Sequence, residues 1–127
     1  MEKSVSLEVL YRAYPIFMDL LEQKLPVATA LKFRELILDL NEYYKEIQDI
    51  QDAVISTFAQ KDANGVYEMP ESVERQYLDE MRERLQKKVT VEWEDISTKE
   101  LGENASLSIK ELATLSFLFN DAKTAVV

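Results

Sequence analysis

Residues 26–58 read PVATALKFRELILDLNEYYKEIQDIQDAVISTF, and this stretch decides the fold. Its apolar residues recur at alternating steps of three and four, which is the spacing of one face of an α-helix. No Gly or Pro interrupts residues 27–64. We therefore predict one long helix from about Pro26 to Gln60, roughly 50 Å in length. The apolar seam of this helix comprises Phe33, Leu36, Leu40, Tyr43, Ile47, Ile50, Val54 and Phe58.

The two halves of this helix differ in composition. Residues 27–40 are apolar on nearly every side, so we expect them to be buried against several elements. From Asn41 onward only a narrow seam is apolar, which predicts packing against one partner helix. That seam has two interpretations: it packs inside the chain, or it forms an oligomer or partner interface.

A third helix is predicted to fold back along the narrow half as an antiparallel hairpin. Residues 62–65 (Asp-Ala-Asn-Gly) carry a turn signal, in which Asn-Gly tolerates positive φ. Pro70 then opens a helix, with the acidic Glu71 in its first turn. The predicted inner face of this helix comprises Val73, Tyr77, Leu78, Met81 and Leu85.

An N-terminal helix precedes the long one. Ser6 is placed to cap its first turn, and Pro15 lies in its middle. Because the apolar seam stays in phase across Pro15, we predict a kinked helix rather than two separate ones. The seam comprises Leu7, Leu10, Tyr14, Phe17 and Leu21.

A short β element is predicted at Val89–Trp93, where apolar and polar residues alternate. A strand needs a partner, and two are considered: residues 66–69, or the same strand of another subunit. Trp93 is interpreted as a core anchor, with an interface hot spot as the alternative.

The C-terminal part is predicted to hold one short helix. Ser108 and Glu111 form a capping box at its start, and Leu107 can pack on Leu112 across it. We expect this helix to end at about Phe119 and residues 121–127 to be frayed. The fold class is thus mainly α, in a single helical domain spanning residues 1–127.

The composition argues against catalysis. The chain has no His, no Cys and only two Gly, so the commonest general base, thiol nucleophiles, the usual zinc ligands and phosphate-binding glycine loops are missing. We predict a protein that is not an enzyme, with no catalytic, cofactor or metal site.

Acidic residues remain as the one candidate chemistry. Glu46 and Asp49 on the long helix could face Asp79, Glu80 and Glu83 on the next and bind magnesium. The favoured interpretation is local charge pairing, because Lys and Arg are interleaved with these acids.

The charge also restricts the partners. There are 24 acids against 15 bases, a net charge of −9, spread evenly along the chain. Direct binding to nucleic acid and attachment to anionic membranes both depend on clustered Lys and Arg. We therefore expect neither, and we expect no membrane span because no apolar run is long enough.

Several stretches resemble small accessory proteins of tailed bacteriophages. They are Leu20–Ala30, the long charged helix after it, Lys61–Gly65, and the Val89–Val91 stretch. The order of elements is similar over most of the chain. These phage proteins largely lack an assigned function, so the resemblance implies a phage or prophage origin and action through binding other proteins.

Two functional classes follow. The favoured one is a structural or assembly component of the phage particle, such as a tail or head–tail accessory protein or chaperone, which forms homo-oligomers. The alternative is an acidic inhibitor of a host defence or nucleic-acid-binding protein. The expected partners are phage structural or host proteins, and the expected location is the host cytoplasm or the virion. The candidate interface residues are Tyr43, Ile47, Ile50, Val54, Phe58, Val89, Val91 and Trp93.

Overall fold

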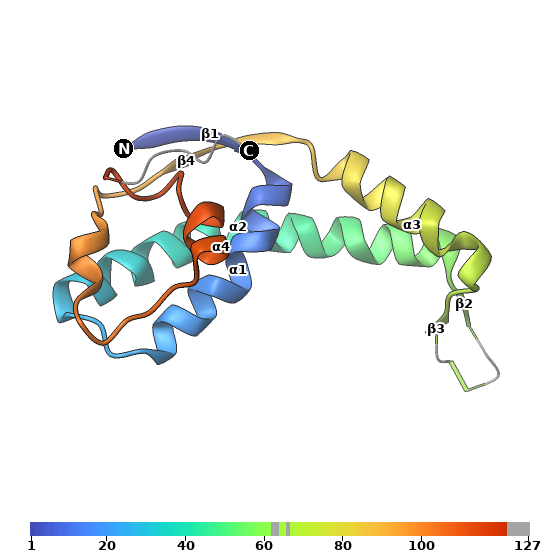
Figure 1. Ribbon diagram of the computed structural model, residues 1–127. Coiled ribbons are helices and arrows are strands. Elements are labelled where there is room, and N and C mark those ends of the chain that lie inside the picture. Colours follow the sequence, from blue (N-terminus) through green and yellow to red (C-terminus); the bar gives the residue numbers. More distant parts are fainter. Residues whose placement is uncertain (62–63, 66, 122–127) are drawn as a thin grey trace.

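A computed structural model describes residues 1–61, 64–65 and 67–121, and it shows a body from which an arm projects (Figure 1). The chain is mainly helical, as predicted. In order, its elements are β1 (Glu2–Ser6), α1 (Leu7–Glu22), α2 (Val27–Phe58), β2 (Gln60–Lys61), β3 (Tyr67–Glu68), α3 (Glu71–Arg84), β4 (Lys88–Glu92), the 3-10 helix η1 (Thr98–Leu101) and α4 (Ile109–Thr114).

The long helix is confirmed as α2, which belongs to both parts of the molecule. Its first half lies in the body, and its second half leaves the body beside α3, which runs antiparallel to it (Figure 1). The short β2–β3 hairpin lies at the tip of this arm. Gly65 in the hairpin loop has φ of +79°, as the turn signal predicts, whereas residues 62–63 lie outside the described part.

The inner face of α3 is confirmed only in part. Met81 and Leu85 are buried, and Val73 and Tyr77 are half-buried. Leu78 was predicted to face inward, yet its side chain is 52% exposed. A two-helix arm has no third layer, so it can cover only the residues that lie directly between its helices.

The first helix begins where the sequence indicates. The Ser6 hydroxyl accepts a hydrogen bond from the Val9 amide at 3.3 Å, which caps α1. The helix continues through Pro15, and the kink at that residue stays a prediction. Leu7, Leu10 and Phe17 of its seam are buried.

The predicted strand is present as β4, but neither partner considered from the sequence is the observed one. It pairs antiparallel with β1, a strand that the sequence did not predict, in a register that places Val5 opposite Val89. Residues Tyr67–Glu68 pair instead with Gln60–Lys61. Both Val5 and Val89 are buried, so the inner face of this ribbon covers the body.

The C-terminal segment differs from its prediction. Both hydrogen bonds of the Ser108–Glu111 capping box are present, but α4 ends at Thr114 rather than near Phe119. Asp121 was expected to fray; instead its carboxylate accepts hydrogen bonds from the Thr98 amide at 2.8 Å and the Thr98 hydroxyl at 2.6 Å. The rest of the expected frayed tail, residues 122–127, lies outside the described residues.

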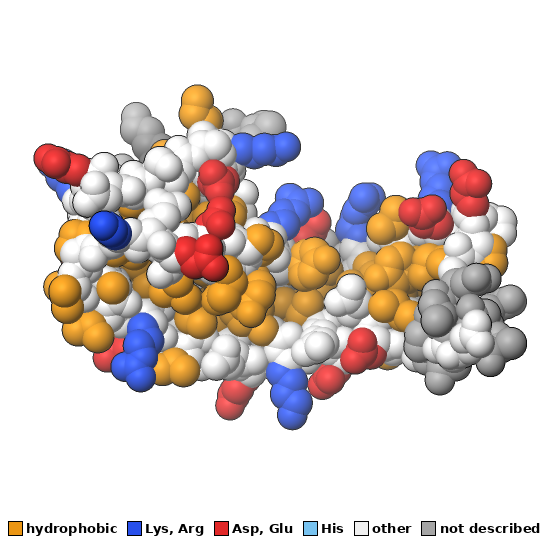
Figure 2. Space-filling model, turned by 90° about the horizontal axis from the view of Figure 1, so that it is seen from below, with side chains coloured by type: hydrophobic (Ala, Val, Ile, Leu, Met, Phe, Trp, Pro, Cys, Tyr) orange, Lys and Arg blue, Asp and Glu red, His pale blue; other side chains and the backbone are white. Residues whose placement is uncertain are grey.

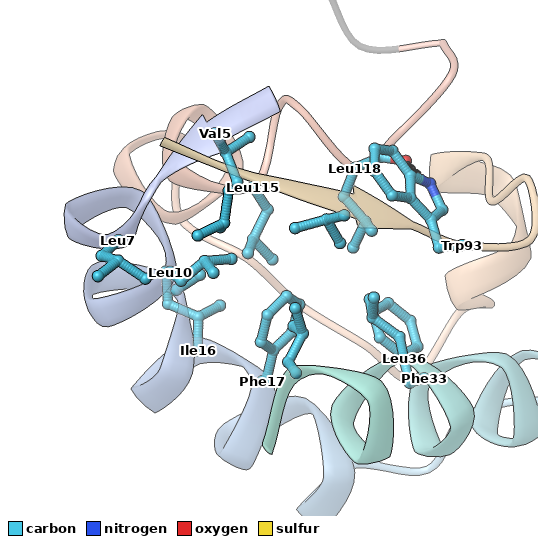
Figure 3. Close-up of a cluster of buried hydrophobic side chains, with 14 of the residues drawn as sticks. Val5, Leu7, Leu10, Ile16, Phe17, Phe33, Leu36, Trp93, Leu115 and Leu118 are labelled. Carbon is cyan, nitrogen blue, oxygen red and sulfur yellow. Dashed lines mark hydrogen bonds between the residues drawn. The ribbon is translucent and has the colours of Figure 1, made fainter. Parts of the chain in front are cut away.

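The core of the body collects side chains from both ends of the chain (Figure 3). Trp93, just after β4, donates from Nε1 to the Leu118 carbonyl at 3.0 Å. Its ring also meets Phe117 edge to face, with 5.9 Å between centroids. This contact fastens the C-terminal segment to the sheet, and Trp93 is the predicted core anchor. The core members labelled in Figure 3 are Val5, Leu7, Leu10, Ile16, Phe17, Phe33, Leu36, Trp93, Leu115 and Leu118.

Replacing Trp93 with Phe should destabilise the protein strongly. The change leaves the Leu118 carbonyl without its indole donor and leaves a gap in the core, so the free energy of unfolding should fall by about 2–3 kcal/mol. Urea denaturation followed by circular dichroism measures this. The matched control is Leu78→Ala at the exposed position in the arm, for which we expect a loss below about 1 kcal/mol. Equal losses for the two variants would contradict the anchoring role of Trp93.

A polar clasp holds η1 against the first half of α2. The Lys32 ammonium donates to Glu100 Oε1 at 2.7 Å and to the Asp95 carbonyl at 2.8 Å. The Glu100 carboxylate also accepts from the Ser97 amide at 2.7 Å, and the Thr29 hydroxyl donates to the Glu100 carbonyl at 2.5 Å. The hydrogen bond from Lys32, followed by the one from Ser97, lowers the pKa of Glu100 below its ordinary value of 4.5.

The clasp predicts a specific loss of stability in acid. A carboxyl whose pKa is lower in the folded state stabilises the fold above the unfolded pKa, and that contribution disappears as the pH falls through the folded pKa. We therefore expect Glu100→Gln to reduce the fall in unfolding free energy between about pH 5 and pH 3, relative to the native chain. The effect should be modest because Glu100 is solvent-accessible and screened. Urea titrations across this range test it, with Glu103→Gln as the control; identical pH profiles for Glu100→Gln and the native chain would refute it.

Candidate interaction surfaces

The predicted interface residues lie largely inside the chain. Five of the eight side chains are buried in the chain's own core: Ile47, Val54, Val89, Val91 and Trp93. Tyr43, Ile50 and Phe58 are half-buried and pack against that core. The Tyr43 hydroxyl donates to the Thr90 carbonyl at 3.0 Å, which ties α2 to β4. These eight side chains therefore offer little accessible surface to a partner.

The first half of α2 is open to solvent on one side, contrary to the prediction that it would be surrounded. Val27 is 78% exposed, Leu31 52% and Leu38 55%. The body covers α2 only on the side of Phe33, Leu36 and Leu40. A helix at the edge of a small body has no second neighbour to bury its opposite face.

This exposed side forms a continuous apolar surface, which we call the leucine face. It includes a groove of about 440 Å³ between the end of α1 and the start of α2. Figure 2, which views the molecule from below, shows hydrophobic side chains gathered over the body and continuing as a stripe along the arm. The leucine face comprises Leu21, Leu25, Val27, Ala30, Leu31, Arg34, Ile37 and Leu38.

A second hollow lies where α1 crosses the middle of α2, and we call it the tyrosine cleft. Its volume is about 630 Å³. The α1 wall comprises Tyr11, Arg12, Tyr14 and Pro15, and the α2 wall comprises Asn41, Tyr44, Lys45, Ile47, Gln48 and Gln51. This size suits a small molecule or a short peptide rather than a folded domain.

The inner part of the tyrosine cleft is aromatic. The rings of Tyr14 and Tyr44 meet edge to face, with 4.4 Å between centroids. The Tyr44 hydroxyl is buried and has no hydrogen-bond partner among the described residues. Burial, with a smaller contribution from Tyr14, raises the pKa of Tyr44 well above its ordinary value. Tyr44 is therefore neutral at physiological pH, and its hydroxyl carries an uncompensated desolvation cost.

The buried Tyr44 hydroxyl predicts that its removal is harmless to folding. Tyr44→Phe keeps the ring contact with Tyr14 and removes an unpaired polar group, so unfolding free energy should stay constant or rise by up to about 1 kcal/mol. Urea denaturation measures the change. Tyr43→Phe is the matched control, because it breaks the hydrogen bond to the Thr90 carbonyl and should lower stability by about 1 kcal/mol. A loss at Tyr44→Phe as large as at Tyr43→Phe would contradict this account.

The backbone of α1 adds an acceptor at the cleft. Pro15 has no amide hydrogen, so the Tyr11 carbonyl lacks the donor that residue i+4 normally supplies in a helix. Tyr11 and Pro15 both line the cleft. The usual helical hydrogen bond to the Tyr11 carbonyl is therefore missing next to the cleft.

The charge of the cleft is opposite to that of the chain. Its lining holds two basic residues, Arg12 and Lys45, and no Asp or Glu. Arg12 is paired with Glu8 at 2.7 Å. Lys45 has no ion-pair partner within residues 1–61, 64–65 and 67–121. The cleft thus presents at least one unneutralised positive charge on a protein with a net charge of −9.

Two of the acids considered for magnesium pair with a base, but only one of the two pairs is local as predicted. Glu46 is bound by Lys87 across the base of the arm. Glu80 is bound by Arg84 one turn along α3, at 2.8 Å. In the described part of the chain, no group of three or more acidic side chains is placed to hold a metal ion. Nor is any helix of that part long and apolar enough to cross a membrane.

Comparison with known proteins adds no assignment: neither the protein-family models, nor the curated proteins, nor the solved structures give a match to this chain.

Sequence reasoning missed both surfaces. The sequence patterns singled out neither Tyr11 nor Tyr44. One usable signal was present: Tyr11 and Pro15 are four residues apart, which places a carbonyl without its helical donor beside a proline on one helix face. No sequence signal showed that this face of α1 would lie against residues 41–51 of α2.

Proposed function

We propose that this chain is a non-enzymatic phage protein that acts through protein–protein contacts, as a structural or assembly component of the particle. A tail or head–tail accessory protein or an assembly chaperone fits this description. The resemblance of several short stretches of the sequence to small phage proteins is what supports the proposed origin. The leucine face is the single observation that carries the mode of action.

The leucine face supports contact with other subunits because it is costly to leave in water. Monomeric proteins rarely expose a contiguous apolar patch beyond a few hundred Å², and each Å² removed from water contributes roughly 25 cal/mol. Val27, Leu31 and Leu38 recur on one side of α2, where a second copy or another particle protein can cover them. Arg34 is the one charged residue of the face, so the surface is apolar apart from a single positive charge.

The arm supports the same function by its shape. A two-helix hairpin extends from the body, and a hydrophobic stripe follows it (Figure 2). Val73 and Tyr77 of α3 are half-buried and Leu78 is exposed, so the arm retains apolar surface along its length. An element of this kind reaches a neighbouring subunit more readily than a compact body does.

Self-association through the leucine face is directly testable. At protein concentrations of roughly tens of micromolar, size-exclusion chromatography with light scattering should give at least twice the mass of one chain, which is 14.7 kDa. The double variant Leu31→Glu, Leu38→Glu should return it to a monomer, because two carboxylates would be desolvated at the contact. The matched control is Ile109→Glu, at an apolar position that is 90% exposed on α4. A native chain that is monomeric throughout this range would count heavily against the proposal.

Binding partners captured by the native chain from a lysate of infected host cells distinguish the favoured function from its alternative. Recovery of particle proteins, lost with the Leu31→Glu, Leu38→Glu variant, supports an assembly component. Recovery of a host nuclease or defence protein by both forms would overturn it in favour of an acidic inhibitor.

A further inference from the structure

We infer that the tyrosine cleft is a docking site for a short, extended acidic segment of a partner protein. The inference deepens the proposed function and rests on it, because it names the chemistry of one partner. It uses a surface distinct from the leucine face: the two sets of lining residues share no member.

The charge of the lining selects an anionic occupant. Across the whole chain acids outnumber bases by 24 to 15, yet the cleft has two bases and no acid. Lys45 has no carboxylate within ion-pair distance among the described residues, so its ammonium remains available. Arg12 donates one hydrogen bond to Glu8, and its guanidinium has further N–H groups that can donate. A carboxylate of the occupant would complete a charge-assisted hydrogen bond here.

The hydrogen-bonding groups of the lining suit a peptide backbone. Asn41, Gln48 and Gln51 carry side-chain amides, which donate and accept at once. Across the cleft, the Tyr11 carbonyl lacks only its i+4 donor, so the acceptors for a peptide N–H group are the amide oxygens of the α2 wall. An extended peptide presents alternating N–H and C=O groups that need both kinds of partner. A simple inorganic anion would use only the donors.

The length of the α2 wall sets the length of the occupant. The wall runs from Asn41 to Gln51, which is about 15 Å along a helix. An extended peptide rises about 3.3 Å per residue, so roughly four or five of its residues span this wall. The volume of about 630 Å³ likewise holds a few side chains.

The aromatic part of the cleft provides a place for one apolar side chain of the segment. Tyr14, Pro15 and Ile47 supply apolar surface, and the Tyr14 side chain is 41% exposed. Covering that ring removes apolar area from water, which gives affinity beyond the charge pairing. The recognised segment therefore combines acidic residues with a large apolar one.

The probe is a fluorescein-labelled heptapeptide in which glutamates alternate with leucine and phenylalanine. Two comparison probes are its twin with lysine in place of each glutamate and an eight-nucleotide oligothymidylate. Fluorescence anisotropy gives the affinity, and amide chemical shifts of the full chain give the location. We expect the acidic peptide to bind with a dissociation constant of about 100 μM and to shift the amides of Tyr14, Tyr44 and Lys45.

Two surface variants with the same change of charge test the location. Lys45→Glu places an acid in the cleft and should lower the affinity for the acidic peptide by about tenfold. Lys110→Glu makes the same change at the exposed start of α4, outside the cleft, and should alter the affinity by less than about twofold. Gln48→Leu keeps the charge, removes an amide and should weaken binding by about threefold.

Several outcomes would overturn the inference. They are no shift of cleft amides at millimolar peptide, equal weakening by Lys45→Glu and Lys110→Glu, equal binding of the lysine twin, or tighter binding of the oligonucleotide. Failure here is distinguishable from failure of the proposed function. If the native chain oligomerises through the leucine face but does not bind the acidic peptide, only the inference about the tyrosine cleft is refuted. If the native chain is monomeric and binds the peptide, only the proposed self-association is refuted.

Discussion

Helix α2 is longer than the body that it helps to build, and the rest of the structure adapts to that length. Its first half buries Phe33 and Leu36 against α1 and the C-terminal segment, whereas its second half runs on beyond the crossing with α1 and has α3 beside it. The helix cannot bend back on itself because no Gly or Pro interrupts it. The arm, the β2–β3 hairpin at its tip and the return of the chain through β4 all follow from this one rigid element.

The same constraint produces both candidate surfaces. A straight helix at the edge of a small body is covered on one side only, so Val27, Leu31 and Leu38 remain in water. Where α1 crosses α2, side chains of both helices line the tyrosine cleft. Both surfaces carry a basic residue in an acidic protein, Arg34 in one and Lys45 in the other.

Predictions from the sequence were confirmed where both partners of an interaction lie within a few residues of each other. The Ser6 cap, the Ser108–Glu111 capping box and the positive φ of Gly65 were all predicted and observed. Predictions failed where the partner is distant in the chain. The strand β1 has one buried apolar side chain, Val5, and forms because β4 lies beside it. The candidate site depends wholly on such distant contacts, which is why the predicted interface residues are mostly core.

The sequence by itself determined the helices, their caps and the period of the apolar seam, because these depend on interactions within about one helical turn. Only the tertiary structure decided which apolar faces are covered. Leu36 and Leu38 are two residues apart in the same helix, yet one is 2% exposed and the other 55%. Their difference arises from the position of α1 and the C-terminal segment, and those positions result from summing many weak long-range contacts that no local pattern records.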